Sequence, residues 1–191
     1  GVGFGGRQVR RVVRRWFVFL AVALSFAACE PPPDTSPEGA AVVEPTPRPQ
    51  PVPEAVAATV QRLRDIAAQG GYRDLAKLAE QAPDFRSNSA GLSHADYWNL
   101  KMRTGDFPTA HIEKLLSYRF TVEESAQGRI YIWPWMATLA PDEITPAAAR
   151  DIEKLLGPGQ VDALRAGAIW PGYVLGIRED GLWLYFLSGS G

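Results

Sequence analysis

A proline-rich stretch divides this chain into an N-terminal leader and a C-terminal domain. Residues 30–53 contain nine prolines in 24 positions, and most of the others are small or polar. Proline lacks a backbone N–H and restricts φ, so this composition disfavours both helix and sheet. We therefore predict an extended, semi-rigid spacer, which at ~3.1 Å per residue reaches ~70 Å at most.

The residues before this spacer have the pattern of a secretory signal peptide. Five arginines between Arg7 and Arg15 form a positive head, and residues 16–28 are apolar except for Ser25. This apolar run is shorter than the about 20 residues that a membrane-spanning helix needs. The pattern predicts a signal peptide over residues 1–28, with a retained membrane anchor as the alternative. Residues 14–18 are also similar to a twin-arginine export motif, so the export route stays open.

The only cysteine, Cys29, lies between the apolar run and the spacer. Residues 25–29, Ser-Phe-Ala-Ala-Cys, resemble a bacterial lipoprotein box, although Phe26 stands where leucine is usual. The resemblance implies that Cys29 becomes an acylated N-terminus, and Glu30 after it implies the periplasmic side of a Gram-negative outer membrane. Lipid attachment also explains a cysteine that has no disulfide partner, the alternative being a free thiol. We expect residues 29–53 to form a lipidated tether.

The distribution of charge argues against a nucleic-acid partner. The arginine head carries +5, whereas residues 29–53 and residues 54–191 each carry a net charge of −3. No segment of the domain is a basic stripe, so neither nucleic acid nor anionic lipid should be attracted to it. The lipid anchor is thus the only membrane contact expected, and no cofactor is predicted.

Residues 54–191 are long enough for one domain with its own core. Apolar residues recur with helical spacing before residue 117 and again between residues 146 and 166. Alternating patterns predict two hairpins, over residues 118–133 and 173–187, the second turning at Asp180-Gly181. The last strand is apolar on both faces, which predicts a central place in the sheet. We expect an α+β fold in which five or six helices pack on a small antiparallel sheet of two hairpins.

Three segments of this domain resemble an uncharacterised family of bacterial lipoprotein-like proteins, a domain of unknown function. They are SNSAGLSHADYWNL, IYIWPW and GYVLGIREDGLWLYFLSG, and the resemblance covers most of residues 72–190. It implies an exported single domain, and it carries no activity or catalytic residue with it.

Two histidine–carboxylate pairs are the weak catalytic candidates. His94 and Asp96, like His111 and Glu113, are two residues apart, so on a helix they point about 200° apart. Neither pair alone is suited to a metal, and no metal site is predicted. Either histidine could act as a general base if its helix packed suitably. Ser93 beside His94 supplies hydrolase residue types, but Ser93 and Asp96 fit a helix-capping box better.

The aromatic residues are the other candidate site. On the return strand of the first hairpin, Tyr131 and Trp133 are expected to share a face with Arg129, and on the last strand Trp183 is expected to share a face with Tyr185 and Leu187. Most of these rings should form the core. The alternative is a groove for glycan or peptide, with Arg178 also at its rim.

Together these patterns favour a lipid-anchored cell-envelope protein with a binding or scaffolding domain, and favour a non-enzyme. The expected partner is another envelope protein or cell-wall glycan. The alternatives are an envelope hydrolase that uses a histidine–carboxylate pair, and a purely structural envelope component.

Overall fold

The computed structural model describes residues 51–189. The predicted signal peptide, Cys29 and nearly all of the spacer lie outside these residues. The elements, with two short 3₁₀ helices η1 and η2, are α1 (Glu54–Gln69), α2 (Tyr72–Ala79), α3 (His94–Arg103), α4 (Pro108–Leu116), β1 (Thr121–Ser125), β2 (Gly128–Trp133), η1 (Trp135–Thr138), η2 (Pro141–Glu143), α5 (Pro146–Leu156), α6 (Gln160–Arg165), β3 (Tyr173–Arg178) and β4 (Trp183–Ser188).

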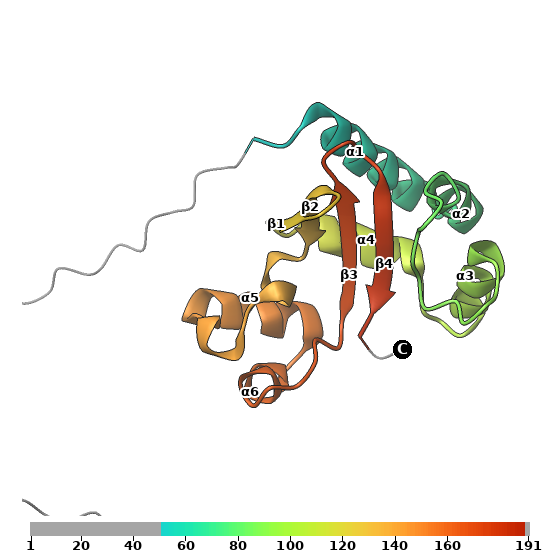
Figure 1. Cartoon of the computed structure of the whole chain (residues 1–191). Helices are drawn as coiled ribbons and strands as arrows, with labels where there is room; N and C mark the ends of the chain where they lie inside the picture. The colour runs from blue at the N-terminus through green and yellow to red at the C-terminus, as the bar shows by residue number, and fades with distance from the viewer. Residues whose placement is uncertain (1–50, 190–191) are drawn as a thin grey trace, which may run out of the picture. The chain divides into compact units, whose positions relative to one another are not determined.

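The fold is α+β, as the sequence predicts, with an antiparallel sheet of order β1-β2-β3-β4 (Figure 1). Each predicted hairpin forms, and β2 pairs with β3 to join them, from Ile130 opposite Arg178 to Trp133 opposite Leu175. The first strand begins at Thr121, three residues later than the alternation from Tyr118 predicts.

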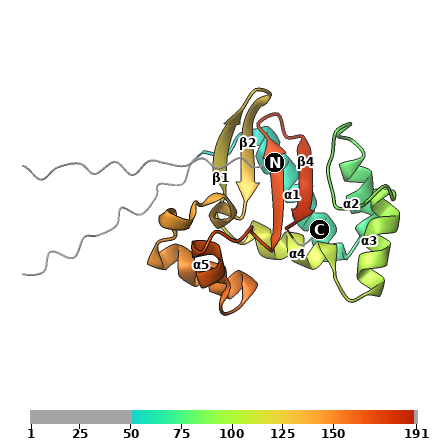
Figure 2. The same cartoon turned by 60° about the horizontal axis from the view of Figure 1, so that its bottom comes forward.

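Helices α1 to α4 supply most of the main core. The apolar residues of α1 that recur at helical spacing, Val56, Val60 and Leu63, are all buried. They pack in one cluster with Leu175 and Ile177 of β3. Both views show α1 and α4 behind the sheet (Figures 1 and 2). This face of the sheet is therefore closed by helices, as the predicted packing requires.

A second core lies at one end of the sheet. Helices α5 and α6 pack there with η1, around the buried Met136, Ile152 and Leu164. Thr145 caps the start of α5, since its Oγ1 accepts a hydrogen bond from the backbone N–H of Ala148 at 3.2 Å.

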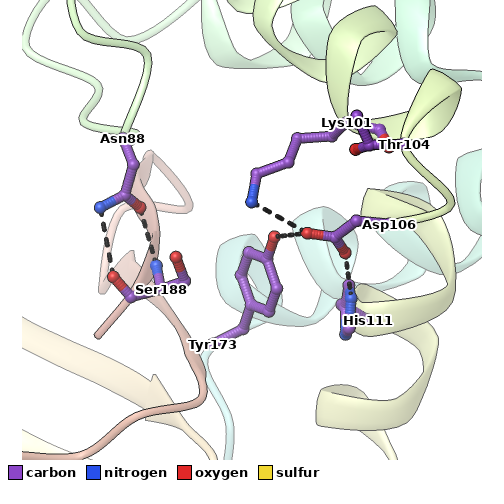
Figure 3. Close-up of polar contacts among 7 residues, drawn as sticks. All are labelled: Asn88, Lys101, Thr104, Asp106, His111, Tyr173 and Ser188. Carbon is purple, nitrogen blue, oxygen red and sulfur yellow. Dashed lines mark hydrogen bonds and ion pairs between the residues drawn. The ribbon is translucent and has the colours of Figure 1, made fainter. Parts of the chain in front are cut away.

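The last strand is not central, contrary to the prediction. β4 is the edge of the four-stranded sheet, and a short segment near Arg86 runs along its outer side. The Arg86 N–H donates to the Leu184 carbonyl, and the Phe186 N–H donates to the Arg86 carbonyl, both at 3.0 Å. The amide of Asn88 then bonds both backbone groups of Ser188 (Figure 3). A non-local segment covers this edge, which a local pattern cannot reveal.

Tyr185 and Leu187 share a face of β4 as predicted, but Trp183 does not share it. A register shift opposite Gly176 and Ile177 inserts one extra residue into β4, so Trp183 pairs with Ile177 while Tyr185 pairs with Gly176. Trp183 and Phe186 are consequently both buried in the main core. The ring of Tyr185 lies across Gly176, where an added Cβ would come within 2.2 Å of Tyr185 Cζ.

Among residues 51–189, every helix is too short or too polar to cross a bilayer.

Candidate functional site

An open hollow of about 420 Å³ lies where α1 and the end of α4 meet the segment that leads into β1. We call it the arginine hollow. Its lining includes Val52, Val60, Arg64, Arg119, Phe120 and Trp133.

The floor of the arginine hollow is apolar and aromatic. The rings of Phe120 and Trp133 lie 5.2 Å apart between centroids, with planes at 49°. Val60 of α1 and Leu116 at the end of α4 extend this floor. Such a surface suits the apolar part of a ligand.

Two cations flank this floor. A guanidinium N–H of Arg64 donates to the Leu116 carbonyl at 3.1 Å, and the Arg119 guanidinium lies 4.5 Å from the centroid of the Trp135 ring. Neither arginine forms an ion pair with a carboxylate anywhere in residues 51–189. Both therefore retain donors that can bind a carboxylate or phosphate.

The residues predicted to line a ligand groove are placed differently. Tyr131 and Trp183 are 2% exposed and lie in the main core, so neither can contact a ligand in this structure. Trp133 is 4% exposed and belongs to the lining of the arginine hollow. Arg129 pairs with Glu179 at 2.9 Å, and Arg178 pairs with Asp180 at 2.6 Å. The three rings therefore do not form a groove, because Tyr131 and Trp183 pack in the main core instead of lining the surface.

A polar cluster forms a second candidate site, between the α3–α4 loop and β3 (Figure 3). Asp106 is at its centre, and we call it the Asp106 cluster. One carboxylate oxygen, Oδ2, accepts from Lys101 Nζ and from the Tyr173 hydroxyl, each at 2.9 Å. The other, Oδ1, lies 2.5 Å from Nε2 of His111. The ring of His111 also stacks on that of Tyr173, with centroids 4.2 Å apart.

Local sequence places Asp106 in this position. Gly105 adopts φ +83°, a left-handed conformation that glycine tolerates best, and ends the turn after α3. Pro108 then begins α4, which carries His111 one turn later. The short loop thus holds the carboxylate beside the first turn of α4.

The hydrogen bonds set the ionisation of this cluster. Partial burial alone would raise the pKa of Asp106, but the bonds from Lys101, Tyr173 and His111 outweigh burial and hold that pKa below its ordinary value. Burial and the bond to Asp106 both raise the pKa of Tyr173. Asp106 is therefore a carboxylate at neutral pH, which requires His111 to donate from Nε2. Within residues 51–189, Nδ1 of His111 has no hydrogen-bond partner.

A smaller hollow of about 220 Å³ adjoins the cluster. His111 and Tyr173 form one side of it, and Leu115, Leu155 and Pro171 supply apolar contacts. An imidazole oriented by a carboxylate thus lies at the rim of a concave, mainly apolar surface.

The predicted catalytic pairs do not form. Nδ1 of His94 lies 3.0 Å from the Ser87 hydroxyl, and Asp96 bonds Ser93 in the predicted helix cap. His111 pairs with Asp106 rather than with Glu113, which lines a separate surface hollow with Arg64. The sequence carried no signal for Asp106 or Tyr173, since 67 residues separate them.

Within the described part of the chain, no three histidine, cysteine or acidic residues are grouped so that they could hold a metal ion.

A scan against models of protein families found no match to this chain, and searches of curated proteins and of solved structures found no significant match.

Proposed function

We propose that this chain is an exported, lipid-anchored protein of the cell envelope, and that its domain binds an anionic ligand with an apolar part in the arginine hollow. One observation carries the binding proposal: Arg64 and Arg119 flank the Phe120–Trp133 floor without any carboxylate partner in residues 51–189.

The net charge of the domain favours the arginine hollow as the place where an anion would bind. Residues 54–191 carry a net charge of −3, so the domain as a whole does not attract anions. The arginine hollow is an exception, because the polar residues of its lining include two arginines and no acid. A ligand that is anionic at one end and apolar beside it satisfies both the cations and the floor.

The predicted tether ends beside the arginine hollow. Val52 belongs to the proline-rich stretch and lies in the lining of the arginine hollow. If Cys29 carries lipid, a spacer of up to ~70 Å would let this hollow meet ligands away from the membrane surface. Another envelope protein or an acidic cell-wall glycan would present anionic groups within that distance.

Fluorescence titration with 8-anilinonaphthalene-1-sulfonate tests the binding proposal. This probe joins a sulfonate to apolar rings, and N-phenyl-1-naphthylamine is its uncharged analogue. We expect the full chain to bind the sulfonate, and Arg64→Gln with Arg119→Gln to weaken binding about tenfold, roughly 1.4 kcal/mol. Binding of the uncharged analogue should change little.

A matched variant controls for net charge. Arg103→Gln with Arg150→Gln removes the same charge from exposed positions outside the hollow, and should leave sulfonate binding unchanged. Equal affinity for wild type and the Arg64/Arg119 variant would refute the proposed site.

The Asp106 cluster supports a second candidate, the envelope hydrolase, with Asp106 in place of Glu113 as the acid that orients His111. The Nε2–Oδ1 distance of 2.5 Å and the free Nδ1 are what a general base acting on water requires. Hydrolysis of p-nitrophenyl acetate that is lost in His111→Gln and reduced in Asp106→Asn would favour it. Equal rates in all three chains would exclude this role.

A further inference from the structure

The two edges of the sheet differ in a way that identifies a docking position. The outer side of β4 is occupied by the segment near Arg86 and Asn88. The outer side of β1 pairs with no other backbone segment in residues 51–189. A free edge of this kind can accept one more strand.

The ladder determines which groups of β1 are free. The Arg129 carbonyl of β2 accepts from the Glu179 N–H, so the backbone groups of Arg129 face β3, and those of Glu124, its partner on β1, face away from β2. Because this orientation alternates along an antiparallel strand, the backbone groups of Val122 and Glu124 face the open edge. These are the groups that an added strand would bond.

Charge along this edge is polarised. The arginine hollow, with Arg64 and Arg119, lies where the chain enters β1. Glu123 and Glu124 lie near the other end, are exposed, and form no ion pair within the described residues. An occupant therefore needs a negative end at the hollow and positive side chains beside Glu123 and Glu124.

Strand direction completes the argument. A segment that pairs antiparallel with β1 runs from beside Ser125 towards Thr121, so its C-terminal end arrives at the hollow. We propose that the ligand is the free C-terminal tail of another protein, added to β1 as an antiparallel strand. Its terminal carboxylate binds Arg64 and Arg119, its last apolar side chain packs on Phe120 and Trp133, and its upstream lysines or arginines face the two glutamates.

This inference rests on the proposed binding site and names the class of ligand for it. The five residues of β1 span ~17 Å at ~3.3 Å each, so about five residues of the tail would be bound. The carboxylate supplies the anion, and the backbone of the tail satisfies the open edge.

A library of ten-residue peptides with free carboxyl ends, randomised at the last six positions, tests the proposal on the full chain. We expect selected peptides to end in an apolar residue with lysine or arginine upstream. The strongest binder should lose about tenfold or more in affinity as its C-terminal amide, and a similar factor against Arg64→Gln with Arg119→Gln. In an added strand, every second backbone N–H of the peptide points towards β1. N-methylation at those positions should therefore abolish binding, whereas N-methylation at the positions between them should have little effect.

Glu124 allows a test of the edge itself. Glu124→Pro removes an outward N–H and a charge, whereas Glu124→Gln removes only the charge. We expect a loss of about tenfold for the proline variant and about twofold for the glutamine variant, with both folded by circular dichroism.

Different failures are separable. If the naphthalene sulfonate binds through Arg64 and Arg119 but no free-acid peptide is selected, or amides bind equally well, the tail inference is wrong and the proposed site stands. If binding of the sulfonate is also unaffected by Arg64→Gln with Arg119→Gln, both the proposed site and the tail inference are wrong. Peptides that bind without dependence on Glu124→Pro or backbone methylation would overturn strand addition.

Discussion

His111 and Tyr173 stack with their ring planes at 30° and donate hydrogen bonds to opposite oxygens of the same carboxylate, that of Asp106. Helix α4 and strand β3 are thereby joined through one loop residue. The same arrangement holds Tyr173 against Phe186, whose ring lies 4.7 Å away.

Asp106→Asn should destabilise the domain by about 1 kcal/mol, because it weakens charge-assisted bonds to Lys101 and His111 while keeping the shape of the side chain. Urea unfolding at pH 7 measures this difference. Asp74→Asn is the control, because Asp74 forms only an exposed ion pair with Lys77 on α2. Equal losses in both variants would show that the Asp106 cluster contributes no more than a surface pair.

Stability should also fall in acid through Asp106. Its pKa is lowered in the folded state, so its contribution is present above the ordinary value near 3.8 and is lost as pH falls through the lower folded value. In Asp106→Asn this part of the acid dependence should disappear. Unfolding free energies of the two chains should therefore converge as the pH falls below the ordinary pKa near 3.8; a constant difference would contradict the assigned shift.

Alkaline pH should act through Tyr173 in the opposite direction. Burial and Asp106 raise its pKa, so its contribution is complete below the ordinary value near 10 and is lost as pH rises through the folded value. Burial raises the pKa of Tyr185 to about 12. Absorbance titration at 295 nm should show these two tyrosines ionising last, and Tyr173→Phe should remove one late step. If Tyr173→Phe instead removed a step that occurs near the ordinary tyrosine pKa, the Tyr173 hydroxyl could not be buried and bonded to Asp106 as described.

The contact between Gly176 and Tyr185 gives a prediction about packing. Gly176→Ala should cost about 1–3 kcal/mol of unfolding free energy, because the new methyl group displaces the Tyr185 ring. The cost should be much smaller when Tyr185→Ala is also present, as a double-mutant cycle would measure. Additive losses would mean that the ring does not lie across the glycine.

Much of the fold could be predicted because its determinants are local. The helix that starts after Ser93 follows from the Ser93–Asp96 cap, and α1 ends at Gly70, whose φ is +67°. The hairpin at Asp180-Gly181 forms where that dipeptide predicts it.

What could not be predicted depends on contacts between distant residues. The Arg86 segment covers β4 across about a hundred positions, and the register shift at Gly176 puts Trp183 and Tyr185 on opposite faces of the sheet. The arginine hollow joins Arg64 to Arg119, and the Asp106 cluster joins two helices to a strand. No periodicity within one segment carries that information.

The account depends most on the proposed lipid at Cys29, because without it the predicted spacer and the proposed envelope partner have no basis. The most direct measurement is intact mass with membrane fractionation of the full chain in a Gram-negative host, beside Cys29→Ala. We predict a mature protein that starts at Cys29, carries acyl chains and sediments with membranes, while the variant is released. An unmodified cysteine, with both chains soluble in the periplasm, would contradict the account.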